Sequence, residues 1–493
     1  MISELLQNAR DYESQMLDRI PDDERPKFHL TGGCGWINDP NGFSFFKGAY
    51  HLFYQYHPYS NNWGSMHWGH AVSEDLLTWK RLPVAMAPDE KYDNFGCFSG
   101  SAIVPEDGRH MILYTGVEML QKKRYEQGQI RQTQCLAFGD GVNYEKYAGN
   151  PVIVPEDVPG GCAESDFRDP KIWRDEDGTF YAVVSAMNRD FTCRIVLFQS
   201  HNGFDWEYAG TLAESTPELG GMWECPDFFE LDGKHVLLVS PMAMMPDGRE
   251  FHVGHNTMAI IGEFDKKSGS FLQESLQAID SGIDFYAPQT TVTPDGRRVM
   301  IGWMQAWSNS KFVPPNVNYF GQLTLPRELS IREGRLIQNP IRELEDRRKE
   351  QVIYNDLWMD TGKTLLPGVR GRLVDMTITV KDLSRLKKLT IRVAADGNYY
   401  TDTILIPGKN LIRLERDHSG YLYDIVHSRE MQVKPRGAMY KIRFILDRYS
   451  MEIFVNDGER AGTLTFFTPQ EADGIEFWCE GQTAIDVEKY ELG

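Results

Sequence analysis

The sequence is poor in paired cysteines, in long apolar runs and in basic residues. Its seven cysteines, at positions 34, 97, 135, 162, 193, 225 and 479, are odd in number and show no CxxC or CxxH spacing. This pattern argues against a disulfide framework and against a zinc site, so we expect buried free thiols. We also expect no metal ion and no cofactor.

Basic residues are outnumbered by acidic ones. The chain has 52 Lys and Arg against 71 Asp and Glu, a formal net charge of −19. Proteins that bind nucleic acids concentrate basic residues to displace counterions from phosphates, so nucleic acid is not an expected partner. Anionic membrane surfaces are disfavoured for the same reason.

Long hydrophobic segments are missing as well. No run reaches the roughly 18 apolar residues that a transmembrane helix needs. The N-terminus passes from Met1 into acidic residues without the basic stretch and apolar core of a signal peptide. We therefore predict a cytoplasmic protein with no membrane partner.

The residues that are present indicate an all-β chain with a helix at its start. Residues 2–20 carry apolar side chains in a helical rhythm that Pro21 would end, which predicts a helical segment within residues 1–27. Beyond it, short runs rich in Tyr, Phe, Trp, Val and Ile are broken at short intervals by Gly, Pro or Asn. Such runs are typical of β-strands.

A charged linker is predicted at residues 341–350. Eight of the nine residues from Arg342 to Glu350 are charged, and only Leu344 is apolar. After it, nearly alternating segments such as 376–380 and 451–455 are separated by turn signals such as Asp396-Gly397. Residues 351–493 are therefore predicted to form an antiparallel β-sandwich.

An internal repeat organises the region before the linker. Five segments consist of a turn glycine followed by a strongly apolar strand, and the glycines are Gly48, Gly108, Gly178, Gly233 and Gly296. Their spacings of 60, 70, 55 and 63 residues suit one four-stranded blade each, which predicts a five-bladed β-propeller over residues 28–340. Asp-Gly turns are common on their own, so the residues upstream carry further weight.

Nine positions before each glycine stands a residue that can be compared between the blades. These residues are Asp39, Ser99, Asp169, Glu224 and Ala287. If each lies near the start of its blade's innermost strand, all five surround the same end of the central channel. The propeller would then bring three carboxylates together in one pocket.

Clustered carboxylates without a basic cluster suit acid–base and nucleophilic chemistry on a neutral polyol. In glycoside hydrolysis one carboxylate attacks or activates water, and a second, kept protonated, gives its proton to the leaving oxygen. Nearby aromatic rings could stack on a sugar, and several polar side chains could bind its hydroxyls: Asn38, Gln55, Ser99, Arg168 and Gln289. His51, His57, His67 and His70 are expected on strands and turns of the first blade and not on a metal.

Four motifs in order carry a resemblance to a known family. They are Trp36-Ile37-Asn38-Asp39-Pro40-Asn41-Gly42, Phe98-Ser99-Gly100, Arg168-Asp169-Pro170 and Trp223-Glu224-Cys225-Pro226. Together they closely resemble the β-fructosidase family, glycoside hydrolase family 32, over about residues 28–330. The segment from Asp447 to Gly458 resembles a motif of that family's C-terminal sandwich. The resemblance implies a five-bladed propeller followed by a β-sandwich, in agreement with the repeat.

The resemblance also implies roles for individual residues. Asp39 would be the nucleophile, Glu224 the general acid/base and Asp169 the stabiliser of the transition state. The fructose pocket would be lined by Asn38, Gln55, Trp63, Phe98, Ser99 and Arg168, with Tyr286 and Trp303 as further members. Ile37 replaces the more usual Met, an exchange of similar size. Asp227 is assigned to holding a strand or a neighbour and not to catalysis.

The expected function is that of a retaining glycosidase. It would release terminal β-D-fructofuranosyl units from small saccharides, namely sucrose, sucrose 6-phosphate or short fructo-oligosaccharides. A retaining enzyme needs its two carboxyl groups about 5–5.5 Å apart, whereas an inverting one separates them by about 6.5–9.5 Å. Two alternatives stay open: an inverting five-bladed arabinanase-like glycosidase, and a catalytically silent carbohydrate-binding propeller. The sequence assigns no oligomeric state.

Overall fold

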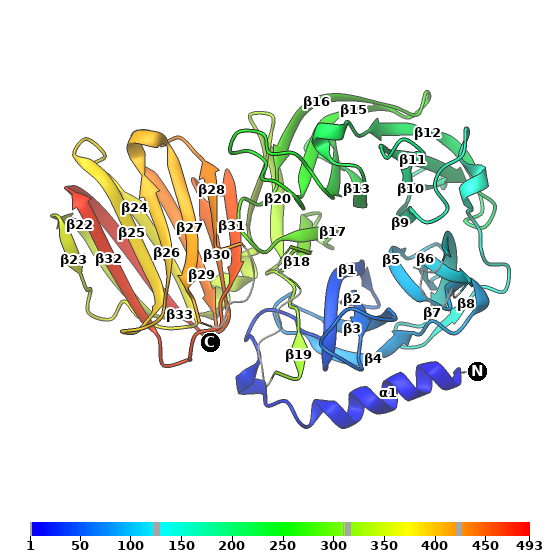
Figure 1. Ribbon diagram of the computed structural model, residues 1–493, viewed down its shortest axis with the longest axis horizontal. Helices are drawn as coiled ribbons and strands as arrows, with labels where there is room; N and C mark the ends of the chain where they lie inside the picture. Colours follow the sequence, from blue (N-terminus) through cyan, green and yellow to red (C-terminus); the bar gives the residue numbers. More distant parts are fainter. Residues whose placement is uncertain (1, 122–128, 309, 311–316, 421–425) are drawn as a thin grey trace.

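The chain folds into a ring of five sheets beside a sandwich of two sheets (Figure 1). The computed structural model describes residues 2–121, 129–308, 310, 317–420 and 426–493. The predicted fold class is confirmed: an all-β five-bladed propeller, followed by a β-sandwich and preceded by one short helix.

Each blade is an antiparallel sheet of four strands whose first strand is innermost. Blade I contains β1 (Gly35–Phe46), β2 (Ala49–His57), β3 (His67–Ser73) and β4 (Lys80–Met86). Blade II contains β5 (Gly96–Ile103), β6 (His110–Gln121), β7 (Gln129–Gly139) and β8 (Tyr144–Lys146). Blade III contains β9 (Phe167–Arg174), β10 (Phe180–Met187), β11 (Cys193–Ser200) and β12 (Glu207–Glu214).

The last two blades follow the same plan. Blade IV contains β13 (Trp223–Leu231), β14 (Lys234–Pro241), β15 (Met258–Asp265) and β16 (Ser270–Ala278). Blade V contains β17 (Tyr286–Val292), β18 (Arg298–Trp303), β20 (Arg327–Arg332) and β21 (Arg335–Pro340). The short strand β19 (Tyr319–Phe320) leaves this order and pairs in parallel with β1 of blade I.

The five repeat glycines occupy equivalent turns. Each lies between the first and second strand of its blade, with φ between +73° and +88°. Residues with a Cβ seldom adopt this left-handed conformation, which explains why glycine recurs there. The repeat found in the sequence therefore corresponds to the blades.

The ring closes between blades V and I, where the innermost strands β17 and β1 belong to separate sheets that pack against each other and β19 adds its short pairing with β1. The side chain of Gln289 on β17 spans the junction. Its Oε1 accepts a hydrogen bond from the amide of Phe43 at 2.8 Å, and its Nε2 donates to the carbonyl of Gly100 at 2.9 Å. One amide side chain therefore links blade V to blades I and II.

The N-terminal helix α1 (Glu4–Leu17) packs against β4 of blade I. Ser3 caps it, because its hydroxyl accepts a hydrogen bond from the amide of Leu6 at 3.1 Å. The helix ends four residues before Pro21, which the sequence pattern indicated as its stop. No helix within the described ranges is long and apolar enough to cross a membrane.

The sandwich packs two six-stranded sheets face to face around an apolar core. The first sheet contains, in spatial order, β22 (Arg348–Met359), β33 (Thr483–Leu492), β24 (Val374–Val380), β29 (Tyr440–Asp447), β30 (Ser450–Val455) and β31 (Arg460–Thr465). The second contains β23 (Gly362–Thr364), β32 (Gly474–Gly481), β25 (Leu386–Ala395), β26 (Tyr400–Ile406), β27 (Leu411–His418) and β28 (Ser428–Gln432).

The predicted linker is an ordered part of the junction. It holds a 3₁₀-helix, Arg342–Arg347, and its only apolar residue, Leu344, is buried. Strand β22 begins at Arg348, three residues before the predicted start of the sandwich at 351. Arg348 links β22 to β24 of the same sheet, because its Nε donates a hydrogen bond to Asp375 Oδ2 at 2.8 Å.

Buried charges join the two bodies. His29, which precedes β1, lies between two sandwich carboxylates: its Nδ1 is 2.7 Å from Asp447 Oδ2 and its Nε2 is 3.0 Å from Glu452 Oε1. Burial disfavours the imidazolium, but the hydrogen bonds and charges of the two carboxylates outweigh burial and raise the pKa of His29 to about 9. His29 is therefore a cation at neutral pH.

We predict that this cation makes the stability of the protein depend on alkaline pH. The pKa of His29 in the folded protein lies above its ordinary value of 6.5, so its contribution is complete below pH 6.5 and is lost as the pH rises through about 9. The melting temperature of the wild type should therefore fall over this window. His29→Gln should melt lower at pH 7 and fall less steeply. Parallel melting curves for the two proteins from pH 6 to 10 would contradict this role.

Candidate functional site

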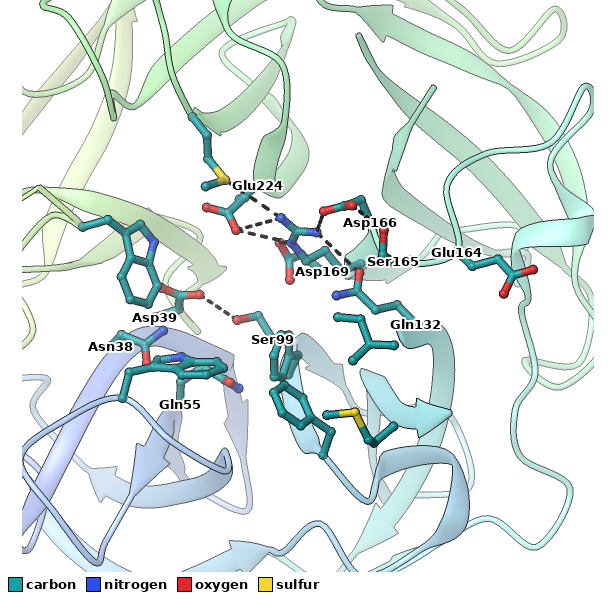
Figure 2. A pocket seen from close by; sticks show the side chains of 18 of the residues that line it. Asn38, Asp39, Gln55, Ser99, Gln132, Glu164, Ser165, Asp166, Asp169 and Glu224 are labelled. Carbon is teal, nitrogen blue, oxygen red and sulfur yellow. Dashed lines mark hydrogen bonds and ion pairs between the residues drawn. The ribbon is translucent and has the colours of Figure 1, made fainter. Parts of the chain in front are cut away.

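One end of the propeller channel opens into a pocket of about 950 Å³ (Figure 2). Its wall contains residues of blades I to IV together with Trp307. Carboxylates, amides and aromatic rings dominate the lining, which is made by Asn38, Asp39, Gln55, Trp63, Phe95, Phe98, Ser99, Met119, Leu120, Gln129, Ile130, Gln132, Glu164, Ser165, Asp166, Arg168, Asp169, Glu224, Met242 and Trp307.

A break in strand pairing marks the same place in every blade. The register between the first and second strand shifts at Ile37/Pro40 in blade I, Phe98/Gly100 in blade II, and Glu224/Asp227 in blade IV. Blades III and V shift at the equivalent points, next to Asp169 and Ala287. Such β-bulges re-aim side chains, and here they lie at the residues found nine positions before the repeat glycines.

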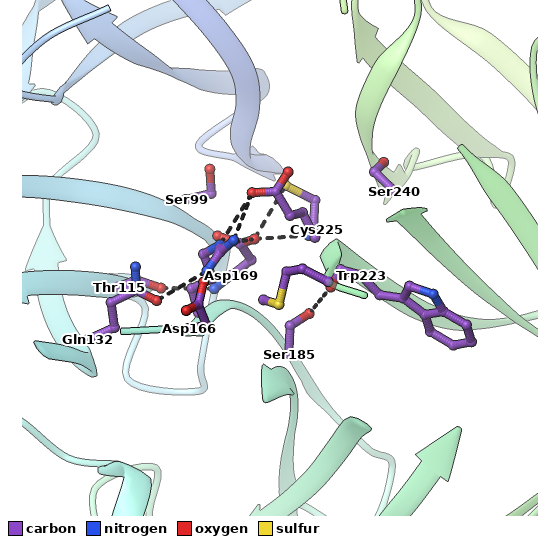
Figure 3. A network of polar contacts seen from close by, with 12 residues as sticks. Ser99, Thr115, Gln132, Asp166, Asp169, Ser185, Trp223, Cys225 and Ser240 are labelled. Carbon is purple, nitrogen blue, oxygen red and sulfur yellow. Dashed lines mark hydrogen bonds and ion pairs between the residues drawn. The ribbon is translucent and has the colours of Figure 1, made fainter. Parts of the chain in front are cut away.

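Backbone strain accompanies these bulges. Asp169 has φ of +65° and Cys225 has φ of +51°, which are rare conformations for residues that carry a side chain. Such strain costs roughly 1–3 kcal/mol per residue and persists only where the surrounding structure enforces it. The enforcing contacts include a hydrogen bond from the amide of Asp169 to Thr115 Oγ1 at 2.9 Å (Figure 3).

Asp39, on β1, is held through one of its two oxygens. Its Oδ2 accepts a hydrogen bond from the hydroxyl of Ser99 at 2.8 Å and lies 3.5 Å from the thiol of Cys225. Its Oδ1 has no hydrogen-bond partner among the residues that the structure describes. The carboxylate is therefore fixed in orientation while one oxygen keeps its lone pairs uncommitted.

Arg168 is the shared cation of the pocket. Its Nη1 donates to Asp166 Oδ1 at 2.8 Å, and its Nη2 donates to Glu224 Oε1 at 3.1 Å. The third carboxylate, Asp169, lies 3.8 Å from its Nε. One guanidinium therefore stands among three carboxylates, as the dashed lines of Figure 2 show for Asp166 and Glu224.

Glu224 has a second neighbour in Tyr286. The hydroxyl of Tyr286 lies 2.8 Å from Glu224 Oε2 and 2.8 Å from the backbone carbonyl of Ser240. A hydroxyl has one proton to donate, and a carbonyl can only accept. If Tyr286 donates its proton to the carbonyl of Ser240, the contact with Glu224 is a hydrogen bond only when Glu224 is protonated and donates to the Tyr286 oxygen. The geometry therefore accommodates a protonated Glu224.

Asp169 is held from both neighbouring blades. Besides the bond from its amide to Thr115 of blade II, its Oδ2 accepts a hydrogen bond from the amide of Cys225 of blade IV at 3.0 Å (Figure 3). Trp223 is held in turn, because the hydroxyl of Ser185 donates to its carbonyl at 2.5 Å. The blades are thereby cross-linked at the depth of the carboxylates.

Burial and the repulsion of neighbouring carboxylates favour protons on Asp39 and Asp169. Burial and the negative charge of Glu224 raise the pKa of Asp39 to about 6, although the Ser99 hydrogen bond opposes the shift. Burial also raises the pKa of Asp169, against the charge of Arg168. Burial alone would lower the pKa of Arg168, but the surrounding carboxylates raise it, so Arg168 remains a cation.

Most of the residues expected in the site line this pocket. Asn38, Gln55, Trp63, Phe98, Ser99 and Arg168 all belong to the lining, together with the three carboxylates. Tyr286 is buried outside the lining and contacts Glu224. Trp303 is also buried outside the lining, with its ring 5.8 Å from that of Trp36 and 5.1 Å from that of Trp307. Trp307 is the member of this aromatic cluster that reaches the pocket.

Ten lining residues were not singled out from the sequence, namely Phe95, Met119, Leu120, Gln129, Ile130, Gln132, Glu164, Ser165, Asp166 and Met242. Gln132 is on the third strand of blade II, and Met119 and Ile130 come from its long β6–β7 hairpin. Asp166 precedes Arg168 by two positions, and residues so spaced in extended chain point to the same side. That spacing is the one sequence signal that could have identified Asp166, since no motif contains the others.

Asp227 is buried outside the pocket lining and holds neighbouring blades together, as expected from the sequence. Its Oδ2 accepts hydrogen bonds from Lys171 Nζ at 3.0 Å and from the amide of Thr290 at 2.6 Å. Lys171 also donates to the carbonyl of Thr290 at 2.7 Å. The pair therefore joins blades III, IV and V.

Across the described ranges, no group of three or more His, Cys, Asp or Glu side chains is arranged to hold a metal ion. Two of the histidines noted in the sequence pair with each other in blade I, where His51 Nδ1 lies 3.0 Å from His70 Nε2.

Two family models match nearly the whole chain. The glycosyl hydrolases family 32 N-terminal domain matches residues 29–340, and the glycosyl hydrolases family 32 C-terminal domain matches residues 343–492. Curated relatives include a raffinose invertase of Escherichia coli, 37% identical over 462 residues, and a sucrose-6-phosphate hydrolase of Escherichia coli, 33% identical over 466 residues. Each alignment covers 93% of this chain and 93% of the relative.

Solved structures agree with these matches. A mutant GH32 β-fructofuranosidase of Bombyx mori in complex with sucrose superposes with a TM-score of 0.83 at 33% identity, covering 99% of this chain and 97% of that one. An exo-inulinase of Aspergillus awamori superposes with a TM-score of 0.82 at 26% identity, covering 95% and 98%.

We predict that the Lys171–Asp227 pair stabilises the ring. Lys171→Met leaves a buried carboxylate without its cation, which should lower the free energy of unfolding by about 3–5 kcal/mol. Adding Asp227→Asn removes that charge and keeps an acceptor for Thr290, so the double variant should recover most of the loss. Urea unfolding of the three proteins measures this, and a single variant as stable as the wild type would contradict it.

Proposed function

This chain belongs to glycosyl hydrolase family 32, and we propose that it releases terminal β-D-fructofuranosyl units from small saccharides with retention of configuration. The observation that carries the proposal is the convergence of Asp39, Asp169 and Glu224 around Arg168 in one pocket. Relatives named for raffinose, sucrose 6-phosphate and bound sucrose support the substrate class.

In the first step we assign the attack to Asp39. Its Oδ1 forms a bond to the anomeric C2 of the fructosyl unit while Ser99 holds Oδ2. The bond from C2 to the glycosidic oxygen breaks, and Glu224 gives that oxygen its proton. The Tyr286 hydroxyl lies 2.8 Å from Glu224 Oε2 and from a backbone carbonyl, so it can accept a hydrogen bond from a protonated Glu224, which supports this role.

In the second step water displaces Asp39. The water oxygen bonds to C2, its proton passes to Glu224, and Asp39 leaves as a carboxylate, so that both catalytic groups regain their starting states. We assign to Asp169 the binding of fructosyl hydroxyls, whose hydrogen bonds strengthen as positive charge develops on the ring. The positive charge of Arg168 offsets the repulsion between Asp169 and Glu224, and its contacts hold both side chains in position.

The rim of the pocket supports a short leaving group. Trp63 offers a partly exposed indole beside Phe98, with ring centroids 5.9 Å apart. The lining also includes the apolar side chains of Met119 and Ile130 and the polar side chains of Glu164 and Ser165. We propose sucrose, sucrose 6-phosphate and short fructo-oligosaccharides as substrates. The cytoplasmic location stays a prediction from the sequence.

The central prediction is fructose release. Wild-type protein should release fructose from sucrose, sucrose 6-phosphate or 1-kestose, and Asp39→Asn should lower kcat by about 10³-fold or more because the amide cannot act as the nucleophile. Glu224→Gln should lower kcat by roughly 10²–10⁴-fold for substrates with poor leaving groups. Product analysis by chromatography measures both effects.

The control for this prediction is the folded state of each variant, since both exchanges are nearly isosteric and should preserve the circular dichroism spectrum. Full activity of Asp39→Asn would refute the assignment. Release of arabinose units with inverted configuration, or no release from any saccharide, would favour one of the alternatives raised by the sequence.

The pH profile tests the environment of Asp39. Its pKa of about 6 implies that kcat/KM falls as the pH drops through about 6, because the nucleophile must be ionised. Ser99→Ala removes a hydrogen bond that favours the carboxylate, so the acidic limb should move to higher pH by about one unit. An unmoved or acid-shifted limb would show that Ser99 does not tune Asp39.

A further inference from the structure

Two carboxylates of the sandwich are buried against the propeller with all their oxygens in use. Asp447 is inaccessible to solvent, and its Oδ1 accepts a hydrogen bond from the amide of Lys27 at 2.8 Å. Its Oδ2 accepts from the amide of Phe28 at 2.8 Å and faces His29 Nδ1 at 2.7 Å. One sandwich carboxylate therefore fixes three consecutive residues of the chain that enters blade I.

Glu452 holds the same segment together with another one. Its Oε1 faces His29 Nε2 at 3.0 Å and accepts from the amide of Leu325 at 2.9 Å. Its Oε2 accepts two hydrogen bonds from Arg327, at 3.0 Å from Nε and 2.6 Å from Nη2. Arg327 in turn donates from Nη1 to Asp280 Oδ2 at 3.0 Å.

These anchored segments lead directly to the pocket. Residues 27–29 precede β1, which carries Asn38 and Asp39, and Asp280 stands six residues before Tyr286. The two segments held by Glu452 are also bonded to each other, because the amide of Leu323 donates to the carbonyl of Leu30 at 2.9 Å. Between them and the pocket lies the aromatic packing of Trp36 on Phe320, with ring centroids 5.4 Å apart.

The contacts of Asp447 and Glu452 also lie at the junction where blade V meets blade I. Blades I and V meet through the packing of β17 against β1 and the short pairing of β19 with β1, and both of the anchored segments border this junction. Figure 1 shows the sandwich standing beside blade V at this side of the ring. A small rotation of blade I against its neighbours would move Asp39 relative to Glu224 and Asp169, which belong to other blades.

We propose that Asp447 and Glu452 are positioning residues for the reaction: by clamping residues 27–29 and 325–327 they set the place of β1, and hence of Asp39, against the carboxylates of blades III and IV. The inference rests on the proposed function for its kinetic test. It assigns the sandwich a part in assembling the active site, although neither residue lines the pocket.

The chemistry of the anchors favours positioning over simple adhesion. Buried ion pairs add little net stability compared with apolar packing, because desolvation offsets the attraction. Their directional hydrogen bonds, however, define a geometry that apolar packing leaves looser. A network of this kind at the junction where the last blade meets the first is therefore suited to fixing the position of β1.

The test compares two buried sandwich carboxylates in the full-length protein. In Asp447→Asn one carboxylate oxygen becomes an NH2 group, which cannot accept hydrogen bonds from the N–H groups of residues 27–29. These residues, and β1 after them, should therefore shift. We expect kcat on sucrose to fall by about 10- to 100-fold with KM changed less than about twofold, since a misplacement near 1 Å can cost about 100-fold. The matched control is Asp375→Asn. Asp375 is equally buried but pairs with Arg443 and Arg348 inside the sandwich.

The control should melt at a lower temperature and keep its kcat within about twofold, because its lost ion pairs do not reach the propeller. A merely stabilising role for Asp447 would make the two variants alike at temperatures well below melting. Equal kcat values for wild type, Asp447→Asn and Asp375→Asn would overturn the inference. If Asp447→Asn fails to fold, Glu452→Gln takes its place in the same comparison.

Hydrogen exchange gives a readout that does not depend on activity. In Asp447→Asn the backbone amides of residues 27–38 should exchange faster while those of β9 in blade III keep their protection, and Asp375→Asn should leave both sets unchanged. Unaltered exchange at residues 27–38 would also overturn the inference. If the wild type released no fructose, the proposed function would fail, and the exchange experiment alone would still decide whether the sandwich positions β1.

Discussion

The charge balance around Arg168 is the constraint on which the pocket depends. Asp166, Asp169 and Glu224 all lie within 4 Å of its guanidinium, and Asp39 stands beside them. Negative charge therefore exceeds positive charge in a buried space, and burial together with the neighbouring carboxylates raises the pKa of Asp39 and of Asp169. A site that keeps one acid protonated beside an ionised one is what acid-assisted displacement requires. Any substitution of Arg168 would disturb all of these groups together.

The repeat made much of this arrangement predictable. Each blade has one residue nine positions before its turn glycine, and a propeller places such equivalent strand positions at one end of its channel. These residues are Asp39, Ser99, Asp169, Glu224 and Ala287. The β-bulges that turn these residues toward the pocket were not visible in the sequence, since a register shift depends on pairing with the second strand. The residues could therefore be predicted from the sequence, whereas the reason for their orientation could not.

What the sequence left open has a common physical cause. Gln132, Met119 and Ile130 reach the pocket from the second and third strands of blade II, and how far these strands extend depends on the length of their hairpin and not on a motif. Trp303 and Trp307 could not be distinguished, because both are aromatic residues near the end of β18 and both pack on Trp36, although only Trp307 reaches the pocket. The contacts of Asp447 with residues 27–29 join parts of the chain more than 400 residues apart.

The most direct test of the account is a search for the covalent intermediate. Protein mixed with sucrose is quenched in acid within one turnover, digested with pepsin and analysed by mass spectrometry. The account predicts that a peptide from β1 containing Asp39 gains the mass of one fructosyl unit, and that Asp39→Asn shows no such peptide. Turnover of sucrose with the β1 peptide unmodified at every quench time, and with fructose first released in the inverted configuration, would contradict it.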